Sequence, residues 1–215
     1  MFIKKIYFFF LLLISVNSFS QNDDIPNYRS TRENFKKILD KDIRADLASY
    51  SLAGIDESLT KEQLQNISSS NTGDDFIEFK QDSFYVKIVT GSFEKEKHKL
   101  LYYNEKYLIK IDNKPFWGTN YSLPKKTISS VTITIGKDTI KIPATAYFDL
   151  YEPVLSYYDK TSGAAKTHSA IYLSKDGRKI YIYMINGEGA GSYEVTWIIQ
   201  DKTYLRRVVD WGFQN

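Results

Sequence analysis

Cysteine is missing from this chain of 215 residues, and its absence excludes several classes of protein. Thiol catalysis, cysteine-ligated zinc sites and iron–sulfur clusters all require this side chain. A fold without disulfides must be stabilised by packing alone, even if the protein is exported. The chain also offers no thiol to which a lipid could be attached.

Histidine is scarce as well, with only His98 and His168. Two histidines are too few for a three-histidine zinc site, and neither lies in an H-E-x-x-H sequence. His168 precedes Ser169, but neighbours on a strand point to opposite faces, so they cannot form a nucleophile–base pair. We therefore predict no metal site and no cofactor.

Catalytic motifs are also absent. No serine lies in a G-x-S-x-G turn, and the spacing of the many acidic residues singles out no catalytic pair. We predict no catalytic residues and favour a protein that is not an enzyme. The alternative is a metal-independent secreted hydrolase that uses a pair of carboxylates.

Long apolar runs are confined to the first twenty residues. Lys4 and Lys5 precede an apolar run from Ile6 to Leu13, and the segment ends in Ser18-Phe19-Ser20. This pattern predicts a signal peptide, residues 1–20, cleaved before Gln21. Its apolar core is only about eleven residues long, whereas a membrane-spanning helix needs about 20. We expect a soluble periplasmic or secreted protein with no stable membrane insertion after cleavage.

The charge of the remaining chain is nearly balanced. The formal net charge is +3, and removing the two lysines of the signal peptide leaves +1. A protein with so little excess charge has no electrostatic reason to bind nucleic acid or an anionic membrane surface.

Aromatic residues, by contrast, are abundant: 17 tyrosines, 13 phenylalanines and 3 tryptophans. Tyrosine is enriched in strands, so this composition indicates a β-rich fold. A surface that binds carbohydrate or protein through aromatic side chains is the other interpretation.

The mature length suits a single domain with a substantial core. We predict a flexible leader over residues 21–30 and one α+β domain over 31–215, with a helical part at 31–72 and a β-rich part at 74–215. In the helical part, apolar residues recur at steps of three and four and predict one amphipathic helix: Phe35, Ile38, Leu39, Ile43 and Leu47. A capping box at 60–63 predicts a second short helix extending to Ile67. Residues 68–73 read as a turn.

From Phe76 onward the apolar period changes to two, which is typical of strands. Four strands near the C-terminus form a predicted antiparallel meander at 169–174, 179–185, 193–199 and 204–209. Gly177 fits the left-handed position of a three-residue turn, which would place Ala170 opposite Ile182. The predicted fold is thus N-terminal amphipathic helices packed on a mostly antiparallel sheet or sandwich, with a C-terminal β-meander.

The most distinctive segment is the loop from Asn186 to Ser192, with three glycines in seven residues. Its G-x-G-x-G spacing and the strand that follows exclude a phosphate-binding loop, and its single acidic residue excludes a calcium loop. Two interpretations stay open. The glycines either supply positive φ in a wide hairpin loop, or they let the backbone approach a ligand or partner closely.

Glu194 lies near two arginines in the predicted C-terminal hairpin. It shares a face with Arg207 if the hairpin loop has two residues, and with Arg206 if the loop has three. Either register predicts a carboxylate–guanidinium pair, with the other arginine over Trp197. Such a pair is a weak surface bridge or part of an anion-recognition site.

Aromatic and arginine side chains dominate binding energies, so we predict that this end of the sheet binds an unknown protein or glycan. An inhibitor or immunity-like protein is one form of this function, and a glycan-binding module is another. The candidate ligand- or partner-binding residues are Gly187, Glu188, Gly189, Gly191, Tyr193, Arg206, Arg207 and Trp211.

Two short stretches resemble known sequences. The run N-G-E-G-A-G-S-Y-E-V-T-W at 186–197, followed by Y-L-R-R-V-V-D-W-G-F at 204–213, resembles the ending of uncharacterised exported bacterial proteins, which implies no particular function. Asp138-Thr139-Ile140 resembles the acceptor for O-glycosylation of exported proteins in some Gram-negative bacteria. That resemblance implies a glycan on Thr139.

Overall fold

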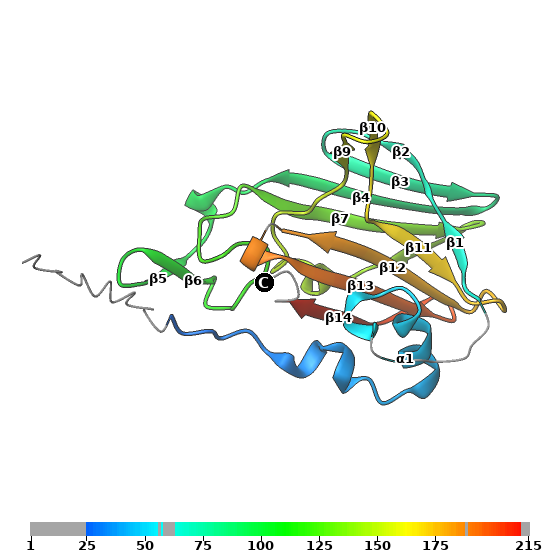
Figure 1. The fold of residues 1–215 in the computed structure, drawn as a ribbon, viewed down its shortest axis with the longest axis horizontal. Coiled ribbons are helices and arrows are strands. Elements are labelled where there is room, and N and C mark those ends of the chain that lie inside the picture. Colours follow the sequence, from blue (N-terminus) through cyan, green and yellow to red (C-terminus); the bar gives the residue numbers. More distant parts are fainter. Residues whose placement is uncertain (1–24, 56, 58–62, 188, 212–215) are drawn as a thin grey trace, which may run out of the picture.

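The computed structural model describes residues 25–55, 57, 63–187 and 189–211, in which antiparallel sheets are the dominant regular structure (Figure 1). The prediction of a β-rich, mostly antiparallel fold is confirmed. The helical part is smaller than predicted, and the chain is not a clear helices-on-sheet α+β fold. The predicted signal peptide lies outside the described residues.

Two five-stranded sheets form the body of the molecule. The first sheet has the order β1 (Gln65–Ile67), β11 (Ala170–Leu173), β12 (Lys179–Asn186), β13 (Tyr193–Gln200) and β14 (Thr203–Trp211). The second has the order β2 (Ser69–Thr72), β3 (Phe76–Gln81), β4 (Phe84–Ser92), β7 (Lys126–Ile135) and β8 (Asp138–Lys141). Two separate hairpins pair β5 (Leu100–Tyr103) with β6 (Tyr107–Ile111), and β9 (Tyr157–Asp159) with β10 (Ala164–Lys166).

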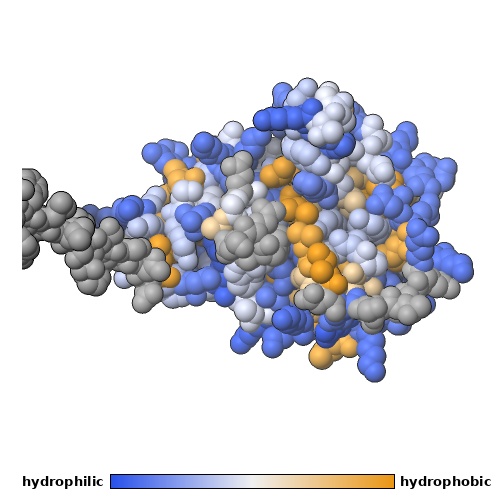
Figure 2. All heavy atoms as spheres, in the orientation of Figure 1, coloured by the Kyte–Doolittle hydropathy of each residue, from blue (hydrophilic) through white to orange (hydrophobic). Residues whose placement is uncertain are grey.

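The main core lies between the two sheets. Alternate residues of β4, such as Val86 and Ile88, are fully buried against Ile182 and Trp197 of the first sheet. This alternation is expected for a sheet with one face in the core and the other toward solvent. The face of the molecule seen in Figure 2 is mostly hydrophilic, with an apolar strip near its middle and smaller apolar patches toward its edges.

The outer face of the first sheet is also covered. Phe35, Ile43 and Leu47 of the N-terminal segment pack on Tyr181 and Ile198 and form a second apolar cluster. Strands of the first sheet are therefore buried on both faces. None of the helices in the described part of the chain is both long and apolar enough to cross a bilayer.

The single long helix predicted from Thr31 is wrong. Two 3₁₀-helices, η1 (Thr31–Glu33) and η2 (Phe35–Lys37), precede a short α1 (Lys41–Ala48). Asn34 and Asp40 are extended, and the Asp40 carboxylate accepts hydrogen bonds from the N–H groups of Asp42 and Ile43. Side-chain capping of this kind starts a new helix instead of continuing the old one. Leu39, expected on the buried face, is consequently 93% exposed.

The second helix and the following turn were also predicted wrongly where the structure describes them. Gln65–Ile67 forms β1 at the edge of the first sheet, and Ser69–Thr72 forms β2 at the edge of the second. β1 pairs with β11, which is distant in the sequence, and β2 pairs with β3, the next strand. Pairing with these strands thus overrides the local turn propensity of these polar residues. Residues 58–62, which carry most of the predicted capping box, lie outside the described residues. The described residues contain four further 3₁₀-helices: η3 (Leu52–Gly54), η4 (Lys95–Lys97), η5 (Ala144–Ala146) and η6 (Gly189–Gly191).

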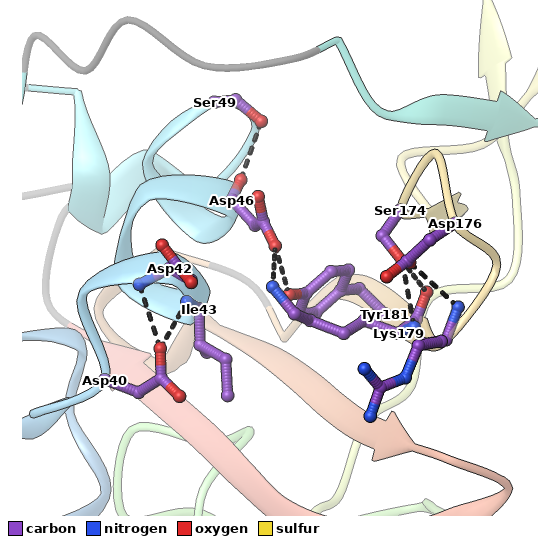
Figure 3. A network of polar contacts seen from close by, with 10 residues as sticks. Asp40, Asp42, Ile43, Asp46, Ser49, Ser174, Asp176, Lys179 and Tyr181 are labelled. Carbon is purple, nitrogen blue, oxygen red and sulfur yellow. Dashed lines mark hydrogen bonds and ion pairs between the residues drawn. The ribbon is translucent and has the colours of Figure 1, made fainter.

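The predicted register of the β11–β12 hairpin is one residue off. Gly177 has φ +67° as expected, but the turn holds four residues, and Ala170 lies opposite Tyr183 rather than Ile182. The Asp176 carboxylate organises the longer turn by accepting hydrogen bonds from the Ser174 hydroxyl and the Arg178 N–H (Figure 3).

Carboxylates fix the N-terminal segment to the outer face of the first sheet. Asp46 of α1 accepts hydrogen bonds from the Lys179 ammonium at 3.0 Å and the Tyr181 hydroxyl at 2.5 Å (Figure 3). Both partners come from β12, so this contact holds α1 against the sheet. Burial and the bond to Asp46 raise the pKa of the Tyr181 phenol.

Two strand residues cap the 3₁₀-helices from outside. Glu194 accepts hydrogen bonds from the Leu52 N–H at 2.9 Å and the Ala53 N–H at 2.8 Å, and Asp210 accepts one from the Phe35 N–H at 2.8 Å. No capping bond comes from the residue that precedes η2 or η3 in sequence, so these carboxylates satisfy the otherwise orphaned donors. Burial raises the pKa of Glu194, and it raises the pKa of Asp210 to about 6.

The raised pKa of Asp210 predicts a specific dependence of stability on pH. Between about pH 4 and pH 6 the folded chain binds more protons at this carboxyl than the unfolded chain does, so the group lowers the free energy of unfolding as pH rises. Asp210→Asn keeps an oxygen acceptor for the Phe35 N–H and cannot titrate. Across this window the parent should lose about 1–2 kcal/mol more stability than the variant, after allowance for partial exposure of the side chain. Urea unfolding at a series of pH values measures this difference, and parallel profiles for the two proteins would contradict the prediction.

Candidate functional site

A cleft of about 670 Å³ opens at one end of the sandwich, where β12 ends. Four segments line it: residues 73–74 before β3, 118–126 before β7, 152–156 before β9, and Gly187 after β12. Its volume is in the range usual for small-molecule sites. Of the predicted binding residues that the structure describes, only Gly187 lines this cleft.

Close contact between backbones builds one wall of the cleft. Gly187 has φ +75°, and a Cβ on it would lie 2.7 Å from the Gly191 carbonyl oxygen and 3.0 Å from that of Gly118. A Cβ on Gly191 would lie 2.6 Å from the carbonyl carbon of Thr119. The loop therefore approaches the chain's own backbone closely, whereas its approach to a ligand or partner stays a prediction. Positive φ at Gly187 and at Gly189, which has φ +51°, shows that the first interpretation holds.

A third segment interlocks at Gly118. This residue has φ +111°, and a Cβ there would lie 2.1 Å from the Tyr151 carbonyl oxygen. Next to it, the Trp117 N–H donates to the Asp149 carbonyl, and the Tyr151 N–H donates to the Trp117 carbonyl, both at 3.0 Å. No side chain would fit at Gly118, Gly187 or Gly191 between these closely packed backbones, and the wall is therefore rigid.

Glu152 ties the lining segments together. Its N–H donates to the Lys126 carbonyl and its carbonyl accepts from the Gly187 N–H, both at 3.0 Å. Its carboxylate accepts hydrogen bonds from the N–H groups of Lys125 and Lys126. Glu152 has φ +49°, a backbone conformation that is strained for any residue other than glycine. Such a conformation persists only where the surrounding structure imposes it.

Tyr193, Arg207 and Trp211 support this wall from behind. Tyr193 is fully buried, and its hydroxyl donates to the Tyr151 carbonyl at 3.1 Å. Trp211 is partly buried and packs edge-on against Trp117, with ring centroids 6.2 Å apart. None of these three presents the open aromatic or arginine surface that a binding anchor needs.

Arg207 is the centre of a buried ion cluster. It donates to both oxygens of Asp149 and to Glu33, and its guanidinium lies 5.3 Å from the centroid of the Trp117 ring. Burial lowers the pKa of Arg207, but its bonds to Asp149 and Glu33 outweigh burial and raise that pKa above its usual value. The charge is thus retained inside the protein, which is favourable only because both carboxylates are present.

The predicted pairing of Glu194 with an arginine is wrong. The hairpin loop has two residues, but a bulge between Ile198 and Ile199 shifts the register, so that Arg207 faces the core opposite Trp197. Glu194 lies on the other face, opposite Asp210, and binds backbone N–H groups instead. An extra residue in one strand reverses the side to which every following side chain points. Arg206 is on the outer face and half-buried.

The sequence predictions missed the other three lining segments. They lie in loops far apart in the sequence, and no motif marks them. One signal was present: Gly73, Gly118 and Gly187 are three of the chain's eleven glycines, and all three line the cleft. Glu188 lies outside the described residues.

In the parts of the chain described here, no group of three or more histidine, aspartate or glutamate side chains is placed to hold a metal ion. No protein-family model, curated protein or solved structure compared with the chain matches it.

The glycine wall can be tested with a matched pair of substitutions. Gly191→Ala places a methyl group against the backbone of Thr119 and Asn120 and should destabilise the fold by roughly 2–3 kcal/mol. Gly189→Ala meets no atom within 4 Å and should cost only about 1 kcal/mol for its positive φ. Urea unfolding compares the two, and equal losses would show that the loop is not packed against residues 119–120.

Proposed function

We propose that this chain is a soluble exported binding protein, periplasmic or secreted, which holds its ligand in the cleft between residues 118–126 and 152–156. The observation that carries the proposal is a cleft of ligand size with a wall of interlocked backbone. A site that is fixed before binding loses little conformational entropy when its ligand arrives.

The chemistry of the cleft supports binding. The groups that line it are mostly hydroxyls, amides and charged side chains, including Asn120, Ser122 and Ser156. Such groups orient a ligand through hydrogen bonds, and the carboxylate of Glu152 is already engaged with two backbone N–H groups. In this proposal Gly187, Gly189 and Gly191 shape the wall, while Tyr193, Arg207 and Trp211 support it. The ligand is a glycan or a segment of another protein, as in an inhibitor or immunity-like complex.

A hydrolase that uses a carboxylate pair is the alternative. The observation in its favour is that Asp74 and Glu152 both line the cleft. A pair of carboxylates across a site is the arrangement that glycoside hydrolysis requires.

Filling the cleft tests the binding proposal. Ser156 is exposed and lines the cleft, so Ser156→Trp should block it without disturbing the core. Thr203→Trp is the matched control: Thr203 is also exposed and lies at the opposite end of β13 from the cleft, about 25 Å along the strand. Each protein is purified from the envelope and medium of its native cells, and the molecules it releases on denaturation are quantified by mass spectrometry.

The parent and the control should carry the same molecule, and Ser156→Trp should carry at least about tenfold less. Equal amounts in all three proteins would contradict the proposal. If the parent instead breaks this molecule down and Asp74→Asn does not, the hydrolase alternative is correct.

Export is tested separately. N-terminal sequencing of the native protein should begin at Gln21 in a soluble fraction, because residues 1–20 have the pattern of a cleaved signal. Recovery of intact Met1 in membranes would contradict export. The resemblance of residues 138–140 to a glycosylation acceptor also implies a glycan on Thr139, which is exposed on β8. The intact mass of the same sample would reveal the added mass of such a glycan.

A further inference from the structure

The β9–β10 hairpin begins at the rim of the cleft. Ser156 lines the cleft and Tyr157 starts β9. Two residues of extended chain span about 7 Å at most, so the Cα of Tyr158 lies within that distance of the Cα of Ser156. Tyr158 does not itself line the cleft, but it lies only two residues along the chain from Ser156, which does.

Tyr158 is 69% exposed, more than any other tyrosine that the structure describes. Its ring is uncovered because the residues around it are small. Ala165 lies directly opposite on β10, and Gly163 in the turn has a backbone position whose Cβ would lie 3.8 Å from the Tyr158 hydroxyl. The hydroxyl end of the side chain thus lies near the turn, and most of the residue is exposed to solvent.

The hairpin that carries this ring is held in one conformation. Asp159 accepts hydrogen bonds from the Thr161 N–H and the Ser162 hydroxyl, both at 2.9 Å, and pairs with Lys166. The bond to Lys166 lowers the pKa of Asp159 to about 2, with the bonds to Thr161 and Ser162 adding to the effect. On the other side, Tyr157 stacks on His168 with ring centroids 4.4 Å apart. An exposed ring on a fixed support can stack on a ligand at low entropic cost.

The charges that line the cleft are balanced. Lys125 and Lys126 are matched by Asp74 and Glu152, and the remaining polar lining consists of hydroxyls, one amide and backbone groups. A site of this kind has no electrostatic preference for an anion or a cation. Its donors and acceptors suit an uncharged ligand rich in hydroxyl groups.

We propose that the ligand is a neutral oligosaccharide, with one sugar ring stacked on Tyr158 and its neighbours bound by the polar groups of the cleft. A sugar ring has an apolar face of C–H groups and an edge of hydroxyls, so it needs both an open aromatic face and a polar cleft beside it. The chain provides these two features within one short segment, residues 156–158. This inference rests on the proposed binding function and names the ligand of the same site.

Calorimetric titration with four neutral pentasaccharides, of β-1,4-glucose, α-1,4-glucose, β-1,4-xylose and β-1,4-N-acetylglucosamine, tests the inference on the mature chain. At least one should bind the parent. Tyr158→Phe keeps the ring and should bind within about twofold of the parent, whereas Tyr158→Ala should bind about tenfold more weakly. Tyr102→Ala is the control, since Tyr102 is 41% exposed on the separate β5–β6 hairpin, and it should bind like the parent.

The inference is overturned if none of the four sugars binds, or if Tyr158→Ala binds as tightly as the parent while its thermal unfolding is unchanged. Failure of this inference alone is recognisable: Ser156→Trp would still lose a native ligand, and that ligand would not be a carbohydrate. If Ser156→Trp keeps its native ligand, the proposed function fails and this inference fails with it.

Discussion

The first sheet is covered on both faces, and this constraint decides where polar side chains can be placed. A polar group buried without a partner costs more than its hydrogen bond would return, so each charged residue on this sheet needs a partner inside the protein. Arg207 meets Asp149 and Glu33 on the core face. On the outer face, Glu194 and Asp210 meet N–H groups at the starts of 3₁₀-helices. The N-terminal segment is therefore both the cover of the sheet and the source of its polar partners.

The same pairing of buried charges also makes the wall of the cleft rigid. Trp117 contacts both the guanidinium of Arg207 and the ring of Trp211, and the next residue, Gly118, packs on the Tyr151 carbonyl. Interactions that satisfy a buried charge thus continue directly into the loop that lines the cleft. The pairing of charges in the core and the shape of the cleft are in this way parts of one packed unit.

The sequence predicted those features that depend on local periodicity. The strands predicted at 179–185 and 193–199 were placed correctly to within one residue, because runs of β-branched and aromatic residues between turn residues are a local signal. The prediction of one continuous helix was wrong because the backbone is extended at Asn34 and because Asp40 caps a new helix with its side chain, a competition that spacing alone does not reveal. The predictions for the segments that form β1 and β2 were wrong because their polar sequences become strands only when a partner strand is present.

The candidate site was less predictable than the fold. The loop 186–192 was identified as distinctive from its glycines. The inward direction of Arg207 was not predicted, because it depends on a bulge that no local pattern in β14 indicates. The remaining lining residues come from three other loops, and their approach depends on the packing of the two sheets. Contacts of this kind are set by tertiary structure, so one sequence read by itself contains no signal for them beyond the glycines that permit them, such as Gly73 and Gly118.

The short connection between β1 and β2 affects the order in which the two sheets can form. Ser68 alone separates β1, at the edge of the first sheet, from β2, at the edge of the second, and Gln65 pairs with Leu173. The strand that completes the first sheet must therefore wait for a partner 108 residues later in the chain. Loop closure over such a distance is entropically costly and makes folding slow. A chain that is still emerging from the ribosome can pair all strands of the second sheet, which end at Lys141, before the first sheet, whose last strand ends at Trp211.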